Sequence, residues 1–176
     1  MPSVTRSRKL SRKSVPADLT KFPDKVYVYL SGPLTAGDLM VNTSKAIEIA
    51  DILMSFGFIV FNPHLSVLGN IAKPRSYESW MTQDLAWVER CDFIFRMDGK
   101  SPGGDREVEH GKKRGIPTFF DKLTPEAVCW NPSTYKWELA KQLHYFVKRH
   151  LCSKSSSRIS SRSKRVLSVI RSTARA

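Results

Sequence analysis

The chain has 176 residues and a formal net charge of +13, and this length allows one domain with a core large enough to fold alone. The sequence contains no run of about 18 apolar residues, so we expect no membrane span. Its basic N-terminus lacks the apolar segment of a secretory signal. Cys91, Cys129 and Cys152 have neither metal-binding nor redox spacing, which favours reduced thiols in the cytoplasm.

The positive charge is concentrated at the two ends of the chain. Residues 1–13 carry five cations and residues 141–176 carry ten, with no acid in either segment. The residues between them hold 14 cations and 16 acids, so the central body has a net charge of −2. We therefore expect one domain over residues 21–151 between disordered basic tails, 1–20 and 152–176. Such tails either are solvated extensions or bind nucleic-acid phosphates without sequence preference, which would place the protein at the nucleoid or nucleus.

Strand and helix patterns alternate along the central body. The expected strands cover residues 25–30, 58–61, 92–97 and 116–120. The expected helices are one capped by Asn42 or Thr43 and ended by Gly57, one over 77–90, a charged one ended by Gly115, and one over 133–151. Residues 62–75 are expected to form a long loop. Because alternating strands and helices form right-handed βαβ units, the sequence predicts a Rossmann-like or flavodoxin-like α/β fold with a parallel sheet of four to five strands flanked by helices.

A glycine-rich turn over residues 99–104 separates the third expected strand from the helix that follows it. Free backbone N–H groups and the helix dipole at such a turn bind phosphate or another anion. Glu107 follows within the helix, where a carboxylate can attack an electrophilic sugar carbon while the turn binds the sugar's phosphate. The alternative is an ordinary loop and a solvated acidic helix start.

Helical spacing distinguishes the acidic residues that face a site from those that face solvent. Asp84 shares a helix face with Trp80 and Trp87. A carboxylate on such an apolar face must find a partner or serve a ligand, so the alternative for Asp84 is a structural cap or salt bridge. On the next helix, Glu107 shares a face with His110 and Gly111 whereas Glu109 points elsewhere, and this geometry favours Glu107.

Several short motifs follow one another in a consistent order. They are Tyr29-Leu-Ser-Gly-Pro33, Trp80, Gln83-Asp84-Leu85-Ala86-Trp87, Cys91-Asp92, Ser101-Pro-Gly103, Glu107 and Gly115-Ile-Pro117. In this order and spacing, the chain resembles the nucleoside 2-deoxyribosyltransferase-like superfamily over roughly residues 25–120. It is most similar to the 2′-deoxynucleoside 5′-monophosphate N-glycosidases and to phage and bacterial relatives with an Asn-Pro-His pattern, here Asn62 to His64.

The resemblance implies a role for each matched residue. Glu107 corresponds to the catalytic nucleophile, Asp84 to a residue that binds a sugar hydroxyl and assists proton transfer, and Tyr29 to a tyrosine near the nucleophile. The residues expected to bind substrate are Ser31, Gly32, Pro33, Asn42, His64, Trp87, Ser101 and Gly103. For His64 the alternative is a histidine that packs the loop.

The activity implied by the resemblance is hydrolysis of the N-glycosidic bond of a (deoxy)nucleoside 5′-monophosphate, which releases free base and sugar phosphate. No metal or cofactor is expected, and the enzyme is expected to be a homo-oligomer. Residues 34–36 stand where the glycosidases usually carry an arginine, so phosphate binding would fall to Lys100 or Arg106. The alternatives are base exchange by a nucleoside 2-deoxyribosyltransferase and a non-catalytic module that senses nucleotides or associates with nucleic acid.

Overall fold

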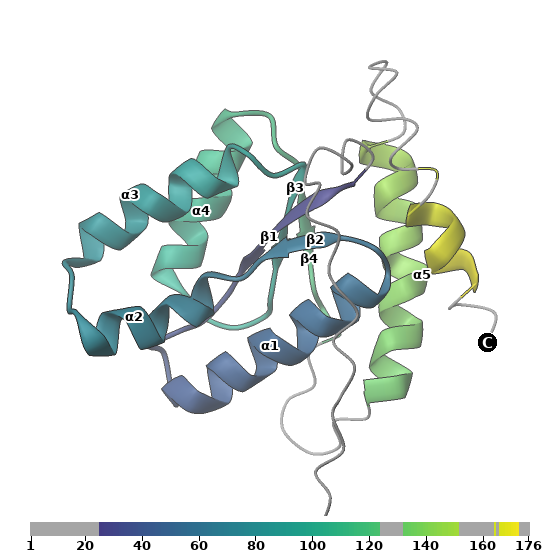
Figure 1. Cartoon of the computed structure of the whole chain (residues 1–176). Coiled ribbons are helices and arrows are strands. Elements are labelled where there is room, and N and C mark those ends of the chain that lie inside the picture. Colours follow the sequence, from purple (N-terminus) through teal and green to yellow (C-terminus); the bar gives the residue numbers. More distant parts are fainter. Residues whose placement is uncertain (1–24, 124–131, 152–163, 165, 173–176) are drawn as a thin grey trace, which may run out of the picture.

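The protein has a four-stranded parallel sheet in the order β2-β1-β3-β4, flanked by helices (Figure 1). The computed structural model describes residues 25–123, 132–151, 164 and 166–172. The strands are β1 (Tyr27–Ser31), β2 (Ile59–Phe61), β3 (Phe93–Arg96) and β4 (Thr118–Phe120). The predicted α/β, Rossmann-like fold is thereby confirmed. The chain moves from β1 to one side of the sheet to form β2, and then to the other side to form β3 and β4. In such sheets ligands bind at the carboxyl ends of the strands, beside the point between β1 and β3 where the strand order reverses.

The helices begin and end at residues with specific capping chemistry. They are α1 (Leu39–Ser55), the 3-10 turn η2 (Pro63–Leu65), α2 (Ser66–Ala72), α3 (Tyr77–Val88), α4 (Pro102–Lys113) and α5 (Pro132–His150). Helix α1 starts earlier than predicted, because the carboxylate of Asp38 accepts hydrogen bonds from the backbone N–H groups of Met40 and Val41 at 2.8 and 2.9 Å. The predicted caps, Asn42 and Thr43, therefore lie inside the helix. Gly57, with φ of +90°, follows its last turn as expected.

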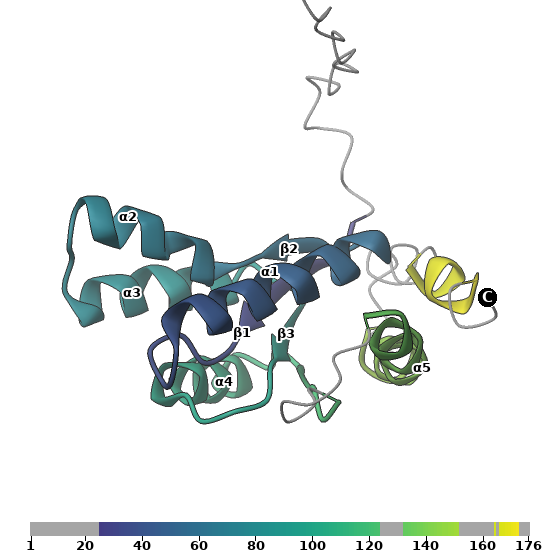
Figure 2. The same cartoon turned by 90° about the horizontal axis from the view of Figure 1, so that it is seen from below.

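Alternate strand residues build a separate core on each face of the sheet. Val28 and Phe95 pack with α1 and α5 on one face, whereas Tyr29 and Ile94 pack with α3 and α4 on the other. Figure 2 shows α1 and α4 on opposite sides of the strands. The two-residue period of strand side chains thus points Tyr29 toward the helix that carries Glu107.

The segment predicted as a loop over residues 62–75 contains η2 and α2 instead. Asn62 Oδ1 accepts a hydrogen bond from the His64 backbone N–H at 3.1 Å, and Pro63 occupies the first turn. Leu68 and Ile71 are apolar at helical spacing but are 72% and 68% exposed. The sequence pattern does not predict this helix because it is short, contains glycine and asparagine, and exposes much of its apolar surface.

Part of the C-terminal segment also differs from the expectation of disorder over residues 152–176. Residues 164 and 166–172 are helical, and three of their side chains, Val166, Leu167 and Ile170, are buried in the same core as α5. The Ser/Arg-rich composition of this segment predicts disorder, because its apolar residues are few and scattered. In the structure, however, these apolar residues are buried against the apolar surface of the core. The remaining residues of this segment and the N-terminal tail lie outside the described part of the chain.

Candidate active site

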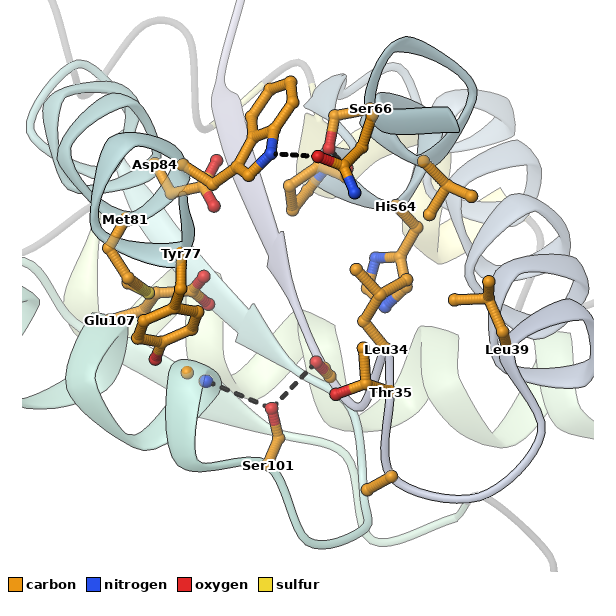
Figure 3. Close-up of a pocket in the computed structure, with 18 of the residues that line it drawn as sticks. Leu34, Thr35, Leu39, His64, Ser66, Tyr77, Met81, Asp84, Ser101 and Glu107 are labelled. Carbon is orange, nitrogen blue, oxygen red and sulfur yellow. Dashed lines mark hydrogen bonds between the residues drawn. The ribbon is translucent and has the colours of Figure 1, made fainter. Parts of the chain in front are cut away.

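A cavity of about 480 Å³ lies beyond the carboxyl ends of β1, β2 and β3. Its walls come from the loop after β1, η2, α2, α3 and the start of α4. Figure 3 shows Asp84, Tyr77 and Glu107 on one side of the cavity and His64 and Leu39 on the other. The residues proposed from sequence that line it are Gly32, His64, Asp84, Ser101, Gly103 and Glu107.

Glu107 is a buried carboxylic acid at the wall of this cavity. Its side chain is 6% exposed, whereas that of Glu109 is 56% exposed. The hydroxyl of Tyr29 donates a hydrogen bond to Glu107 Oε1 at 2.9 Å. Tyr29 is fully buried on β1, and its ring stacks on Phe61 with centroids 5.7 Å apart. The sheet therefore fixes the donor that orients the carboxylate.

The two carboxylic acids of the cavity both have raised pKa values. The pKa of Glu107 is raised to about 7, chiefly by burial and also by the charge of Asp84, against the lowering effects of Ser31, Tyr29 and Arg96. Burial also raises the pKa of Asp84 to about 6, which a hydrogen bond from Tyr29 opposes. The Tyr29 pKa lies well above its usual value, chiefly through burial, so its hydroxyl remains a donor. With pKa values near neutral, this pair of acids can accept a proton and can also donate one at neutral pH.

The burial of Glu107 gives a stability prediction. A carboxyl pKa raised from 4.5 to about 7 means that the folded protein binds a proton more tightly than the unfolded chain. Ionisation of the buried Glu107 carboxyl therefore destabilises the folded protein. This loss of stability is absent below pH 4.5 and complete above about pH 7. At pH 8, Glu107→Gln should therefore have a larger free energy of unfolding than the unchanged protein. The expected gain is up to about 3 kcal/mol, because one pKa unit corresponds to about 1.4 kcal/mol.

Urea unfolding at two pH values measures this effect. At pH 4.5 the two proteins should be nearly equal in stability. Glu109→Gln is the matched control, because its exposed side chain carries no burial penalty, and it should change little at either pH. Equal stability of Glu107→Gln and the unchanged protein at pH 8 would contradict the raised pKa.

The start of α4 forms part of the cavity wall. Ser101 Oγ accepts a hydrogen bond from the Gly104 N–H at 3.1 Å and donates one to the Gly32 carbonyl at 3.0 Å, as drawn in Figure 3. Ser101 thereby caps α4 and ties it to the loop after β1. A Cβ on Gly104 would lie 3.0 Å from Ser31 Oγ and 3.1 Å from the Arg96 guanidinium, so glycine lets the helix start pack closely on the strand ends.

Arg96 supports this turn and was not proposed from the sequence. It is 6% exposed at the end of β3. Its guanidinium donates hydrogen bonds to the Met97 carbonyl, to the Gly99 carbonyl at 3.0 Å and to Asp105 Oδ1 at 3.1 Å. Its charge also lowers the pKa of Glu107. The sequence feature that could have indicated this role of Arg96 is a single cation directly after an apolar strand pattern.

His64 lines the cavity and also holds two segments together. Its Nε2 lies 2.9 Å from the Pro33 carbonyl oxygen, and its Nδ1 lies 3.1 Å from Asn62 Oδ1. Burial lowers its pKa, which the contact with Pro33 opposes. The two roles considered for His64, pocket wall and loop packing, are therefore met by one side chain.

The other residues proposed from sequence are placed around the cavity rather than in its wall. Asn42 Nδ2 donates to the carbonyls of Leu34 and Ala36 at 3.1 and 2.9 Å, which fixes the loop after β1. Trp87 is 41% exposed and stacks on Phe61, with centroids 4.5 Å apart. Neither side chain is among those that line the cavity.

Ser31 lies behind the wall at the end of β1. Its Oγ is buried and finds no hydrogen-bond partner of regular geometry among the described residues. The hydroxyl is nevertheless near enough to the Glu107 carboxylate to lower its pKa. Ser31 thus acts on the site through Glu107 rather than by direct access to the cavity.

Helices α2 and α3 supply an apolar part of the cavity that sequence analysis did not anticipate. Its lining includes Val67, Ile71, Tyr77, Trp80 and Met81. The indole N–H of Trp80 donates to Asn70 Oδ1 at 2.8 Å and joins the two helices. Because α2 was expected to be a loop, this wall was missed.

Arg106, considered as a phosphate ligand, is engaged elsewhere. Its guanidinium pairs with both oxygens of Glu78, at 2.9 and 3.1 Å, and lies over the Tyr77 ring. This pair joins α4 to α3. Lys100 is exposed in the turn before α4, and neither of these two cations is among the residues that line the cavity, whereas Arg75 is.

Two kinds of feature are absent from the described residues. These residues contain no group of three or more His, Cys, Asp or Glu side chains that could hold a metal ion. In the same ranges, no helix is both long and apolar enough to cross a membrane.

Comparison with known proteins identifies one family. A family model described as "Domain of unknown function (DUF4406)" matches residues 26–120. No curated protein and no solved structure matches the chain. The matched residues run from β1 to the end of β4 and so include every element that lines the cavity, whereas α5 lies beyond them. The chain thus belongs to the DUF4406 family.

Proposed function

We propose that the protein hydrolyses the N-glycosidic bond of a (deoxy)nucleoside 5′-monophosphate, with Glu107 as nucleophile. The observation that carries this proposal is the buried Glu107 carboxylate, oriented by Tyr29 at 2.9 Å, at the wall of a cavity that also contains Asp84 and a helix start. Sequence motifs similar to those of the nucleoside 2-deoxyribosyltransferase-like superfamily lie at the same positions and support it.

The chemistry needs an ionised nucleophile and a proton for the departing base. The Glu107 carboxylate attacks C1′ of the sugar and forms a glycosyl ester, as the C1′–N bond breaks and the base leaves. Asp84, with its pKa near 6, can deliver a proton to the base nitrogen. Water then attacks C1′ of the ester and gives its proton to Asp84, which releases the sugar phosphate and restores the Glu107 carboxylate. Base exchange differs only in that a second base replaces water.

The helix start favours a phosphorylated substrate. In the first turn of α4, Pro102 has no N–H and the N–H groups of Gly104 and Asp105 donate to Ser101. The Gly103 N–H and the helix dipole remain to attract a negative charge. Gly103 and Gly104, which have no side chains to block this approach, line the cavity. The apolar wall from α2 and α3 is suited to the base.

A homo-oligomer remains a prediction. Exposed apolar side chains beside the cavity support it, since Met40, Leu68 and Ile71 are each more than 60% exposed. Association through α2 would bury this surface.

The direct test is a panel of nucleoside 5′-monophosphates and nucleosides, with release of free base followed by chromatography. We expect base release from at least one monophosphate without an added acceptor. Base exchange that requires an added second base would favour the transferase instead. Tight nucleotide binding with no base release would identify a non-catalytic nucleotide-binding module.

The two raised pKa values predict a bell-shaped dependence of kcat/KM on pH. Between about pH 6 and 7 the pair of acids holds one proton, mainly on Glu107. The reactive form, with the proton on Asp84 and Glu107 ionised, is a fixed fraction of this singly protonated pair, so activity should be greatest there and fall on both sides. Asp84→Asn should lower the maximum and remove the alkaline fall, because the asparagine cannot lose a proton. Asp51→Asn is the control, because Asp51 is exposed on α1, and it should retain the bell-shaped pH dependence. A single ionisation in the unchanged protein would exclude Asp84 as the proton donor.

A further inference from the structure

Helix α5 and the helical segment after it are additions to the matched family region that are firmly attached to the domain. The family model ends at residue 120. Side chains of both additions are buried in the main core: Tyr135, Leu139, Ala140, Leu143, Val147, Leu151, Val166, Leu167 and Ile170. The opposite face of α5 is therefore held in a fixed orientation toward solvent.

That outer face places an exposed aromatic ring among cations. Tyr145 is 75% exposed, and its nearest neighbours along the helix surface, at positions i−4, i+3 and i+4, are Lys141, Lys148 and Arg149. Lys148 and Arg149 are exposed, and Lys141 is 42% exposed beside Glu138. Glu138 is the only acid in the sequence after residue 126.

The following segment extends the positive surface. Lys164, Ser168, Arg171 and Ser172 line a hollow on it. Arg171 and Lys148, from two different elements, both lower the pKa of His144, although burial is the larger cause. Cations of α5 and of the segment therefore converge on one region.

This region is remote from the cavity described above. In Figures 1 and 2, α5 and the C-terminal segment lie at one end of the molecule, and α2 and α3 lie at the other. None of its residues lines the cavity. Its charge therefore lies away from any small molecule that the cavity would bind.

We propose that the outer face of α5, centred on Tyr145 and flanked by Lys141, Lys148 and Arg149, binds single-stranded nucleic acid. Bases stack on exposed aromatic rings while lysine and arginine contact the phosphates, a combination typical of single-strand binding. An acidic membrane surface fits less well, because the apolar side chains of the C-terminal segment are buried in the core and cannot enter lipid. This proposal goes beyond the proposed function and is independent of it.

Fluorescence anisotropy of the full chain with a labelled, mixed-sequence single-stranded oligonucleotide tests the proposal. Tyr145→Ala should weaken binding by about fivefold or more, since stacking of one base is worth about 1–3 kcal/mol, and Tyr145→Phe should retain it. The double variant Lys148→Gln/Arg149→Gln should reduce the slope of log affinity against log salt by about 1.4, at about 0.7 per lost phosphate contact.

The matched control is Lys112→Gln/Lys113→Gln. It removes two neighbouring exposed cations near the end of α4 and changes the net charge equally, and it should leave affinity and slope nearly unchanged. Equal losses in the two double variants, or an unchanged affinity of Tyr145→Ala, would overturn the proposal. So would equally tight binding of a matching duplex or of polyglutamate, because either result would reflect general attraction to the basic tails.

Discussion

Glu107→Gln should fold normally and lose at least about a thousandfold in kcat, the scale of loss when an enzyme loses its nucleophile. The amide has nearly the same shape as the acid and can still accept a hydrogen bond from Tyr29, but it cannot form the glycosyl ester. Initial rates of base release from the best monophosphate of the panel measure the loss, and circular dichroism checks the fold.

Glu109→Gln is the matched control for this change. The two residues lie on one helix, but Glu109 is exposed and pairs with Lys113 at 3.5 Å, so its variant should keep most of the activity. Mass spectrometry offers a second measurement, since a slowly hydrolysed substrate should leave a sugar phosphate on the peptide that contains Glu107. Nearly full activity of Glu107→Gln, or an adduct on another residue, would reject the assignment.

A monophosphate should exceed the matching nucleoside in kcat/KM by about tenfold or more, since a charge-assisted hydrogen bond contributes about 1.5–3 kcal/mol. The expected donor is the Gly103 N–H at the start of α4, a turn that Ser101 holds in place through Gly104 and Gly32. Ser101→Ala should therefore narrow the preference severalfold. Steady-state kinetics with each substrate pair gives the ratio.

Ser76→Ala separates this effect from the loss of a helix cap. Ser76 caps α3 in the same way, accepting a hydrogen bond from the Ser79 N–H at 3.2 Å, and it does not line the cavity. Both variants should lose about 1 kcal/mol of stability, but only Ser101→Ala should change the preference for phosphate. Similar kcat/KM values for nucleoside and monophosphate in the unchanged protein would contradict an anion site and favour the transferase.

Local sequence patterns were sufficient for the parallel α/β fold and for the prediction that Glu107 and Glu109 lie on different faces of α4. Strand runs, helical spacing and glycine turns are set by interactions between residues close in the chain, and these can be recognised without tertiary contacts. In a parallel sheet the loops after β1, β2 and β3 lie at one edge, and the cavity lies there. Local patterns did not predict α2 or the C-terminal helical residues, whose stability comes from packing rather than from composition.

The chemical state of the site was decided by the tertiary structure. Tyr29 and Glu107 are 78 residues apart in sequence, and only the pairing of β1 with β3 and the packing of α4 bring them together. The raised pKa values of Glu107 and Asp84 depend chiefly on burial, which is a property of the whole surrounding shell. The position of Arg96 beneath the start of α4 likewise depends on long-range packing. The sequence by itself thus determined which groups could react, whereas long-range packing decided which of them meet and how readily each gives up its proton.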